Sequence, residues 1–453
     1  LVQMSWRNAL FLDITGRNDW SSTLPASNRS YFYPSVSTSA VLNELFHFGK
    51  SGGLVDLMKV RASWAQVGHD TSPHRVEDYV TNNGIPGSVT NLSSKLNATL
   101  RPEIVSSWEV GLDLRMFRNR LNLDVAYYNS VTSDIVSSMP ITDATGMSSI
   151  SINAGEIMNQ GVEIALKGTL IKTANVDWKV YANWTMNRNK VLKLGEGVDF
   201  WQIGGYSTFA YMYASVGSSM TGMYGRKYKR APEGSYAVDA AGKLTDVSGQ
   251  LVLDSLGYPQ YDTEIEYIGD VMPNWKGGFG TTFSWKTVKF TIGFDGQKGG
   301  HVWSMTNWIL NARGKGVATL EGRETGLVPT GVKELPDGNY RVNTDPIPAD
   351  GIRSYYGALY SRNCAEANFV STEYLRLREV RLEYSLPKKF LSKTKVINGL
   401  SIAVFGNNLY TWSNFPGFDP TATSLRGHAL APGFELLQMP GTAQYGASIK
   451  LTY

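Results

Sequence analysis

The chain has 453 residues, a net charge of +4 and only 18% charged residues. The small net charge gives no argument for a nucleic-acid partner, and the single cysteine, Cys364, excludes an internal disulfide and a cysteine-based metal site. Every apolar run ends before the ~18 residues that a membrane-spanning helix needs. The 24 Tyr, 12 Trp and 46 Gly are instead typical of long strands with aromatic residues at a membrane interface.

Strict alternation of apolar and polar residues is the main pattern along the chain. In 107–117, for example, Trp108, Val110 and Leu112 alternate with Glu109 and Asp113. Tilted strands of about 9–11 residues cross a bilayer, whereas soluble strands usually have about 5–6. The pattern predicts membrane-spanning strands, with a large soluble β protein as the alternative. Segments of this kind occur at 58–64, 107–117, 121–128, 162–167, 178–186, 289–295 and 400–404.

The connections between these segments alternate in length. Residues 118–120 and 286–287 predict tight hairpins, whereas long loops rich in Gly, Pro and aromatic residues are expected near 195–270, 296–368 and 414–444. Short turns on one side and long loops on the other are typical of outer-membrane barrels, whose long loops lie outside the cell. Tryptophans near segment ends predict an aromatic girdle; they are Trp108, Trp178, Trp275 and Trp285.

Two segments near the C-terminus carry further predictions. Charges crowd one strand near 374–385, where a bulge at Arg378–Glu379 would keep Leu375, Leu377, Val380, Leu382 and Tyr384 on the apolar face. The charged side chains would then face the interior. The last segment alternates from Tyr445 to Tyr453 and ends on an aromatic residue. It is similar to the signal that the barrel-assembly machinery reads.

Ordered motifs over nearly the whole chain resemble the SusC/RagA family of TonB-dependent transporters. They are 15–25 (TGRNDWSSTLP), 31–37 (YFYPSVS), 59–68 (KVRASWAQVG), 101–103 (RPE), 107–113 (SWEVGLD), 152–156 (INAGE), 159–163 (NQGVE), 273–275 (PNW), 375–380 (LRLREV) and 407–413 (NNLYTWS). The resemblance implies an all-β fold, a transmembrane antiparallel β-barrel of 22 strands with a plug domain. It also implies a location in the bacterial outer membrane.

No plug, TonB box or signal peptide is recognisable in these residues. We therefore expect the C-terminal portion of such a barrel over 1–453, with about 13–15 strands and two unpaired edges. The plug and the remaining strands would come from the rest of the protein or from another chain. An N-terminal part is expected to be missing before Leu1.

Exposed aromatic rings in the loops are the candidate ligand contacts, because flat π faces pack against sugar rings. These candidates are Trp201, Tyr206, Tyr211, Trp303, Trp308, Trp412 and Phe415. Interfacial anchoring or loop packing is the competing interpretation and is favoured. The basic run 226–230 (RKYKR) could steer an anionic ligand, but a solvated loop or a lipopolysaccharide contact is the favoured interpretation. The residues predict no catalytic set, cofactor or metal site, and His69, His74, His301 and His428 are scattered.

The leading functional prediction is active, TonB-dependent import of an oligosaccharide or a peptide, with a SusD-like surface lipoprotein as partner. A passive porin-like channel and a surface β-rich adhesin are the alternatives. The chain is not expected to be an enzyme. The sequence does not identify the substrate.

Overall fold

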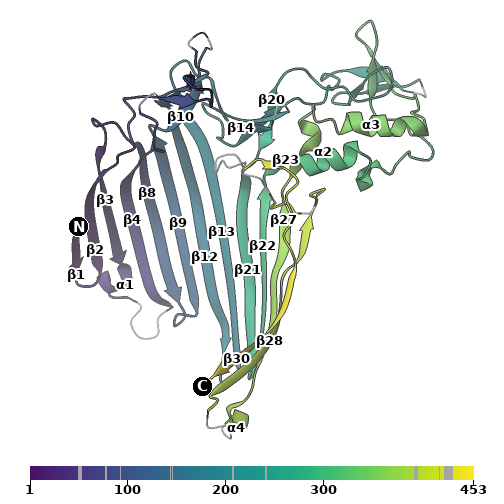
Figure 1. Cartoon of the computed structure of the whole chain (residues 1–453). Helices are drawn as coiled ribbons and strands as arrows, with labels where there is room; N and C mark the ends of the chain where they lie inside the picture. Colours follow the sequence, from purple (N-terminus) through teal and green to yellow (C-terminus); the bar gives the residue numbers. More distant parts are fainter. Residues whose placement is uncertain are drawn as a thin grey trace.

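One antiparallel sheet of 13 strands forms the body of the molecule (Figure 1). The structure is a computed structural model that describes residues 1–48, 54–76, 79–91, 93–142, 144, 146–206, 209–239, 242–391, 396–417, 419–422 and 432–453. Along the sheet the strands follow their order in the chain. They are β1 (Val2–Trp6), β2 (Leu10–Trp20), β3 (Ser30–Val41), β4 (Val55–His69), β8 (Glu103–Met116), β9 (Leu121–Ser133), β12 (Glu156–Lys172), β13 (Val176–Lys193), β21 (Pro273–Trp285), β22 (Val288–Gly299), β27 (Tyr374–Ser385), β28 (Gly399–Ser413) and β30 (Gln444–Thr452).

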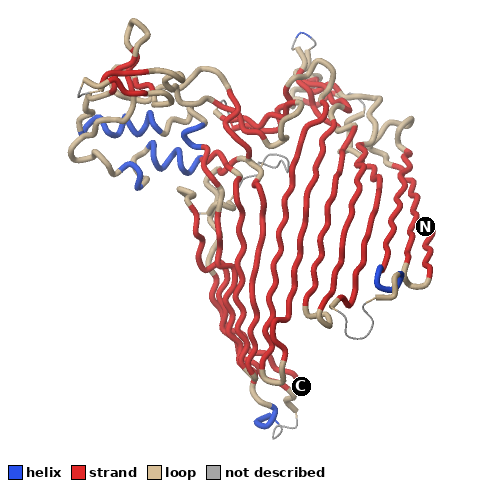
Figure 2. Tube along the Cα trace, turned by 180° about the vertical axis from the view of Figure 1, so that it is seen from behind, coloured by secondary structure: helices blue, strands red, loops and turns tan. Residues whose placement is uncertain are grey.

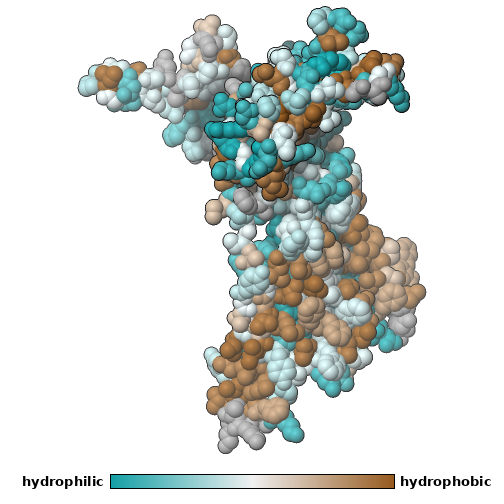
Figure 3. All heavy atoms as spheres, turned by 90° about the vertical axis from the view of Figure 1, so that its right-hand side faces the viewer, coloured by the Kyte–Doolittle hydropathy of each residue, from teal (hydrophilic) through white to brown (hydrophobic). Residues whose placement is uncertain are grey.

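The alternation seen in the sequence becomes two chemically different faces of this sheet. Leu112 in β8 lies opposite Val60 and Val125, whereas its neighbour Asp113 lies opposite Lys59 and Asp124. Like residues are therefore aligned across strands, so one face is apolar and the other is polar. The apolar side chains are solvent-exposed in this single chain, and they form a hydrophobic band over the lower part of the body (Figure 3).

Aromatic residues mark the upper and lower limits of the apolar face. In β21, Trp275 and Trp285 are 39% and 53% exposed and lie ten residues apart. At about 3.3 Å per residue this is roughly 33 Å along the strand. A tilt of about 40° reduces it to roughly 25 Å, the height of the apolar band of an outer-membrane barrel. Trp178 packs edge-on against Phe283 near the lower limit.

Several strands are longer than the predicted 9–11 residues. Strands β12 and β13 have 17 and 18 residues. In β13 the segment 187–193 (NRNKVLK) carries polar residues on both faces. The strands therefore continue beyond the apolar band, where solvent on both sides removes the need for alternation.

The two ends of the sheet differ in the length of their connections (Figure 2). At the end that we call the turn end, 117–120, 173–175 and 286–287 close tight hairpins. Phe117, Arg118 and Asn119 take positive φ there, as hairpin turns require. Helices α1 (Leu42–Leu45) and α4 (Lys388–Leu391) also lie at this end. At the opposite end, the loop end, the longest connections are 194–272, 300–373 and 414–443.

The long connections at the loop end fold into small sheets and helices with their own cores. Trp303, which is 0% exposed, lies in the largest core. Another core, around Val252 and Val332, belongs to a five-stranded sheet. The elements that the site requires are β14 (Phe200–Tyr206), β15 (Ala210–Ser215), β16 (Gly222–Gly225), β20 (Glu266–Asp270), β23 (His301–Ser304), α2 (Met305–Ala312), α3 (Ile352–Leu359), β26 (Phe369–Ser371) and β29 (Phe434–Glu435).

The bulge predicted in β27 is confirmed. The register of β27 shifts between Leu377 and Glu379 against both β22 and β28. Arg378 is the extra residue, so Leu375 and Leu377 stay on the apolar face together with Val380 and Leu382. The main sheet is open among the described residues, because β1 pairs only with β2 and β30 pairs only with β28. In the part of the chain that the structure describes, no helix is long and apolar enough to span a membrane.

Candidate functional site

The polar face of the main sheet is held by charged side chains that bridge strands. Arg61 in β4 donates to Asp124 in β9 through both terminal nitrogens, at 2.9 and 3.0 Å. Its Nε also pairs with Glu109 in β8 at 3.2 Å. The guanidinium lies over Gly111, where an added Cβ would come within 2.5 Å of it. A side chain at position 111 would therefore displace the arginine that ties three strands together.

Glycines on the same face of β21 and β22 leave a depression. The Tyr181 hydroxyl lies 2.6 Å from a Cβ placed at Gly280 and 2.8 Å from one placed at Gly293. One tyrosine from β13 therefore covers the bare backbone of two strands. Beside it is a cavity of about 610 Å³, which we call the wall cavity. Its lining includes Asp124, Glu163, Asn183, Lys276, Asp295, Tyr374 and Arg378.

A second cavity of about 460 Å³ lies where the polar face reaches the loop end. We call it the mouth cavity. It shares Thr185, Lys276 and Tyr374 with the wall cavity, so the two adjoin. Its polar lining residues are Thr185, Asn187, Thr221, Lys276, Gln297, His301, Thr372, Tyr374 and Thr421. Strands β13, β21, β22 and β27 all contribute to it together with residues of the three long connections, so the cavity lies between the wall of the sheet and the loop end.

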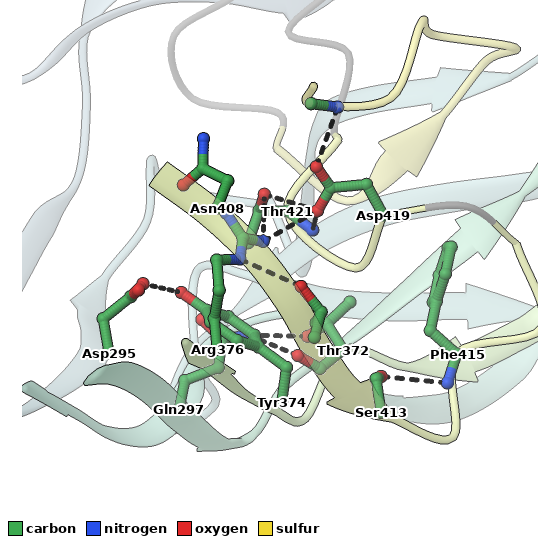
Figure 4. A network of polar contacts seen from close by, with 12 residues as sticks. Asp295, Gln297, Thr372, Tyr374, Arg376, Asn408, Ser413, Phe415, Asp419 and Thr421 are labelled. Atoms are coloured by element: carbon green, nitrogen blue, oxygen red, sulfur yellow. Dashed lines mark hydrogen bonds and ion pairs between the residues drawn. The ribbon is translucent and has the colours of Figure 1, made fainter. Parts of the chain in front are cut away.

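Hydrogen bonds fix the side chains behind the mouth cavity (Figure 4). The Gln297 amide donates to the carbonyl oxygen and to Oγ1 of Thr372, both at 2.9 Å. The Tyr374 hydroxyl donates to Asp295 Oδ2 at 3.0 Å. The Arg376 guanidinium packs on the Tyr374 ring, with 4.9 Å from Cζ to the ring centroid. The lining of the cavity is therefore pre-organised.

A buried ion pair ties the last long connection to this wall. Arg376 Nη2 lies 3.0 Å from Asp419 Oδ1, and their side chains are only 8% and 11% exposed. Burial raises the pKa of Asp419, but hydrogen bonds from Thr421 and from the Gly441 amide, together with the Arg376 charge, outweigh burial and hold that pKa below its usual value. Asp419 is ionised in this setting, so the pair anchors segment 419–422 beside the cavity.

The loop-end core contains three of the seven predicted aromatic candidates. Trp303 is 0% exposed and Trp201 is 9% exposed, so neither offers a free ring face to a ligand. Trp308 is partly buried against the same core and lies 6.4 Å from Trp303, centroid to centroid. Their local role is packing. The burial follows from core formation within the long connections, which a local sequence pattern does not reveal.

Four candidates remain. Tyr211 stacks on Tyr213 at 5.4 Å in a half-exposed aromatic group on the sheet of β14, β15, β16 and β20. Trp412 is 48% exposed on the apolar face of β28, where it meets Tyr410 at 4.8 Å; it does not face the mouth cavity. The Phe415 backbone amide donates to the Ser413 hydroxyl, beyond the end of β28. Tyr206 ends β14, and its side chain lies outside what the structure describes.

The basic run at 226–230 is held by partners far away in the sequence. Three ion pairs form, Lys227 with Glu266, Lys229 with Glu334 and Arg230 with Glu366, at 2.9, 2.7 and 2.6 Å. Between them the Tyr228 hydroxyl donates to the Leu359 carbonyl oxygen, and burial raises the pKa of Tyr228. The run is neither a free anion site nor a freely solvated loop, because the pairs with Glu334 and Glu366 fasten it to the adjoining connection.

The cysteine and two of the histidines are also side chains of a kind that can bind a metal. Cys364 is 0% exposed, and burial raises the pKa of its thiol to about 12. His301 lines the mouth cavity and stacks on Phe369 at 5.0 Å. Among the described residues no three or more His, Cys, Asp or Glu side chains gather as a metal site; His428 lies outside these residues. Lys276, Gln297 and Thr372 carry no local signal in the sequence, because only the pairing of β21, β22 and β27 brings them together.

A family model for the β-barrel of TonB-dependent receptor-like proteins matches residues 1–409. The chain belongs to this family. The described sheet is thus part of an outer-membrane barrel, its apolar face is the lipid side and its polar face is the lumen side. The predicted fold, the SusC/RagA resemblance and the outer-membrane location are confirmed.

Curated relatives of this receptor-family barrel agree with the assignment. TonB-dependent receptors P3 and P26 of Formosa agariphila are 26% and 28% identical, each over 93% of this chain and 41% and 42% of their own lengths. The TonB-dependent receptor SusC of Bacteroides thetaiotaomicron is 26% identical over 44% of this chain and 21% of its own length. The chain thus spans less than half the length of these relatives.

Solved structures share the fold. The RagAB peptide transporter is 23% identical, with a TM-score of 0.73, over 98% of this chain and 46% of that one. The RagAB peptide importer in its open-open state is 21% identical, with a TM-score of 0.74, over 100% of this chain and 46% of that one.

Proposed function

We propose that this chain is the C-terminal barrel wall of a transporter that imports a nutrient, an oligosaccharide or a peptide, across the outer membrane at the expense of TonB-coupled energy. The observation that carries the proposal is the mouth cavity, which opens on the lumen side of a wall whose other side is suited to lipid. A ligand there would lie at the start of a route along the polar face. No catalytic role is proposed.

The rest of the machinery belongs to the remainder of a longer protein and to partners. In hydrocarbon, each unpaired backbone group costs several kcal/mol, so both β1 and β30 need neighbouring strands. We propose that the plug and these strands come from the rest of the protein or from another chain, and that the contact with TonB lies outside these residues. The long connections at the loop end would face the outside of the cell.

A SusD-like surface lipoprotein is the proposed partner at the loop end. The resemblance to SusC and to RagAB supports this assignment. The folded connections around Trp303 and Val332, with their own cores, provide a preformed surface for such a partner.

A passive porin is the competing function, and TonB dependence separates the two. The full-length protein would be expressed in the outer membrane of cells with and without TonB, and uptake of labelled oligosaccharides and labelled peptides would be measured. The proposal expects uptake of one class that requires TonB. Equal uptake in both strains would contradict it. The chain of 453 residues alone, inserted into vesicles, is the matched control and is expected to transport neither class.

A further inference from the structure

The lining of the mouth cavity includes one cationic side chain, that of Lys276. Lys276 and His301 line the cavity, and no aspartate or glutamate is among its lining residues. The other polar lining groups are hydroxyls and carboxamides. The adjoining wall cavity differs, because Asp124, Glu163 and Asp295 are in its lining. Lys276 lines both cavities, and the three carboxylates belong to the lining of the wall cavity alone.

Lys276 lies between two polar residues of the neighbouring strands. It lies in β21 directly opposite Thr185 and Gln297, and all three line the cavity. Two nearby cations are ion-paired, Lys298 with Glu373 at 2.7 Å and Arg376 with Asp419 at 3.0 Å, and a third, Arg378, donates to Asn408 at 2.7 Å. Lys276 has no ion-pair partner among the described residues.

The neighbouring carboxylates that the structure describes form no ion pair with Lys276. Asp295, on the next strand, accepts the Tyr374 hydroxyl through Oδ2, and its buried Oδ1 has no hydrogen-bond partner among these residues. Glu373 holds Lys298 and also accepts the Gly299 amide at 2.9 Å. The Lys276 side chain is exposed, and its ammonium group makes no hydrogen bond to the described residues, so its donors are available to a ligand in the mouth cavity. A charge-assisted hydrogen bond is stronger than a neutral one.

We infer that Lys276 makes the mouth cavity a recognition site for a carboxylate carried by the transported molecule. The inference rests on the proposed import function and names the chemistry of its ligand. Thr185 and Gln297 on either side of Lys276 supply further hydrogen-bonding groups for a polar chain. A uronate sugar and an acidic peptide both carry the required carboxylate.

The test measures binding to the full-length protein, so it does not depend on transport. Two matched pairs of fluorescent probes would be used: tetragalacturonate with its neutral galactose counterpart, and a glutamate-containing pentapeptide with its glutamine counterpart. Fluorescence anisotropy would give Kd for the wild type and for Lys276→Gln, Lys276→Arg and Lys298→Gln. Lys298→Gln is the matched control, since it removes a nearby cation that does not line the cavity.

The inference expects the acidic member of one pair to bind the wild type about 10-fold more tightly than its neutral counterpart. Lys276→Gln should abolish that preference, whereas Lys276→Arg and Lys298→Gln should retain it. The pair that shows the preference identifies the source as sugar or peptide. Equal binding of both members in both pairs, or a preference that survives Lys276→Gln, would overturn the inference. If the probe preference depends on Lys276 but uptake does not require TonB, the proposed function is contradicted and the inference about Lys276 is not.

Discussion

Removing the Asp419 carboxylate tests how the last long connection is attached to the barrel wall. Asp419→Ala leaves the Arg376 guanidinium, 8% exposed, without its charged partner. Breaking a buried ion pair on one side typically costs about 3–5 kcal/mol. Arg376 keeps its hydrogen bond to Thr411 at 3.2 Å and its packing on Tyr374, so we expect the lower end, about 3 kcal/mol.

Hydrogen exchange of the full-length protein measures this cost locally. The amides of Thr421 and Gly441, which donate to Asp419 in the wild type at 2.9 and 3.0 Å, should exchange faster in the variant. Amides in the middle of β27 should not change, because their partners are neighbouring strands. Unchanged exchange at both loop amides would refute the anchoring role.

The same pair sets a pH dependence. The folded-state pKa of Asp419 is lowered from the ordinary value of 3.8. A lowered pKa contributes stability above the unfolded-state value, and this contribution is lost as the pH falls through the folded-state value. The anchor should therefore be intact at neutral pH and should release only below about pH 4.

Three further predictions follow from the faces and ends of the sheet. Leu112→Arg should cost about 2–4 kcal/mol near the bilayer midplane and should lower the temperature at which the barrel loses its heat-modifiable migration on a gel. Asp113→Asn should have a mild effect in the same assay. The opposite order of effects would mean that Asp113, and not Leu112, faces lipid. Deletion of Tyr453 should slow assembly, seen as lower outer-membrane levels of the full-length protein, and normal levels would count against a role in recognition. Glu435, buried at 3% exposure, accepts from Ser304 at 2.6 Å and from the backbone and side chain of Thr306; Glu435→Ala should raise protease sensitivity of the 300–312 segment, and equal cleavage of both proteins would contradict this.

The wall of the barrel could be predicted from the sequence because strand structure has a period of two. In 107–117 the polarity of each residue indicates the face of the sheet on which it lies. The register between strands then follows when apolar residues are aligned with apolar residues. The β27 bulge was predictable for the same reason, since only an extra residue at Arg378 keeps Leu377 and Val380 on one face. Strand length was underestimated, because strands outside the bilayer lose the alternation that revealed them.

The site was less predictable, because it depends on contacts between residues that are distant in sequence. Lys229 meets Glu334 and Arg230 meets Glu366, more than 100 residues away in each case. No local pattern in the sequence shows that Trp303 is buried. It becomes buried when β23 pairs with β29 and β26. The aromatic candidates follow from residue type alone, whereas the strand residues of the mouth cavity come together only through the pairing of the strands.

The central claim is that alternate residues of these strands face lipid and the lumen. Single nitroxide labels at position 112 and at position 113 of the full-length protein in bilayers test it directly, with Cys364 left in place because burial raises the pKa of its thiol to about 12. The label at 112 should be relaxed strongly by oxygen, which concentrates in lipid, and the label at 113 by a water-soluble nickel chelate. Greater access of the nickel chelate at 112 than at 113 would contradict the account.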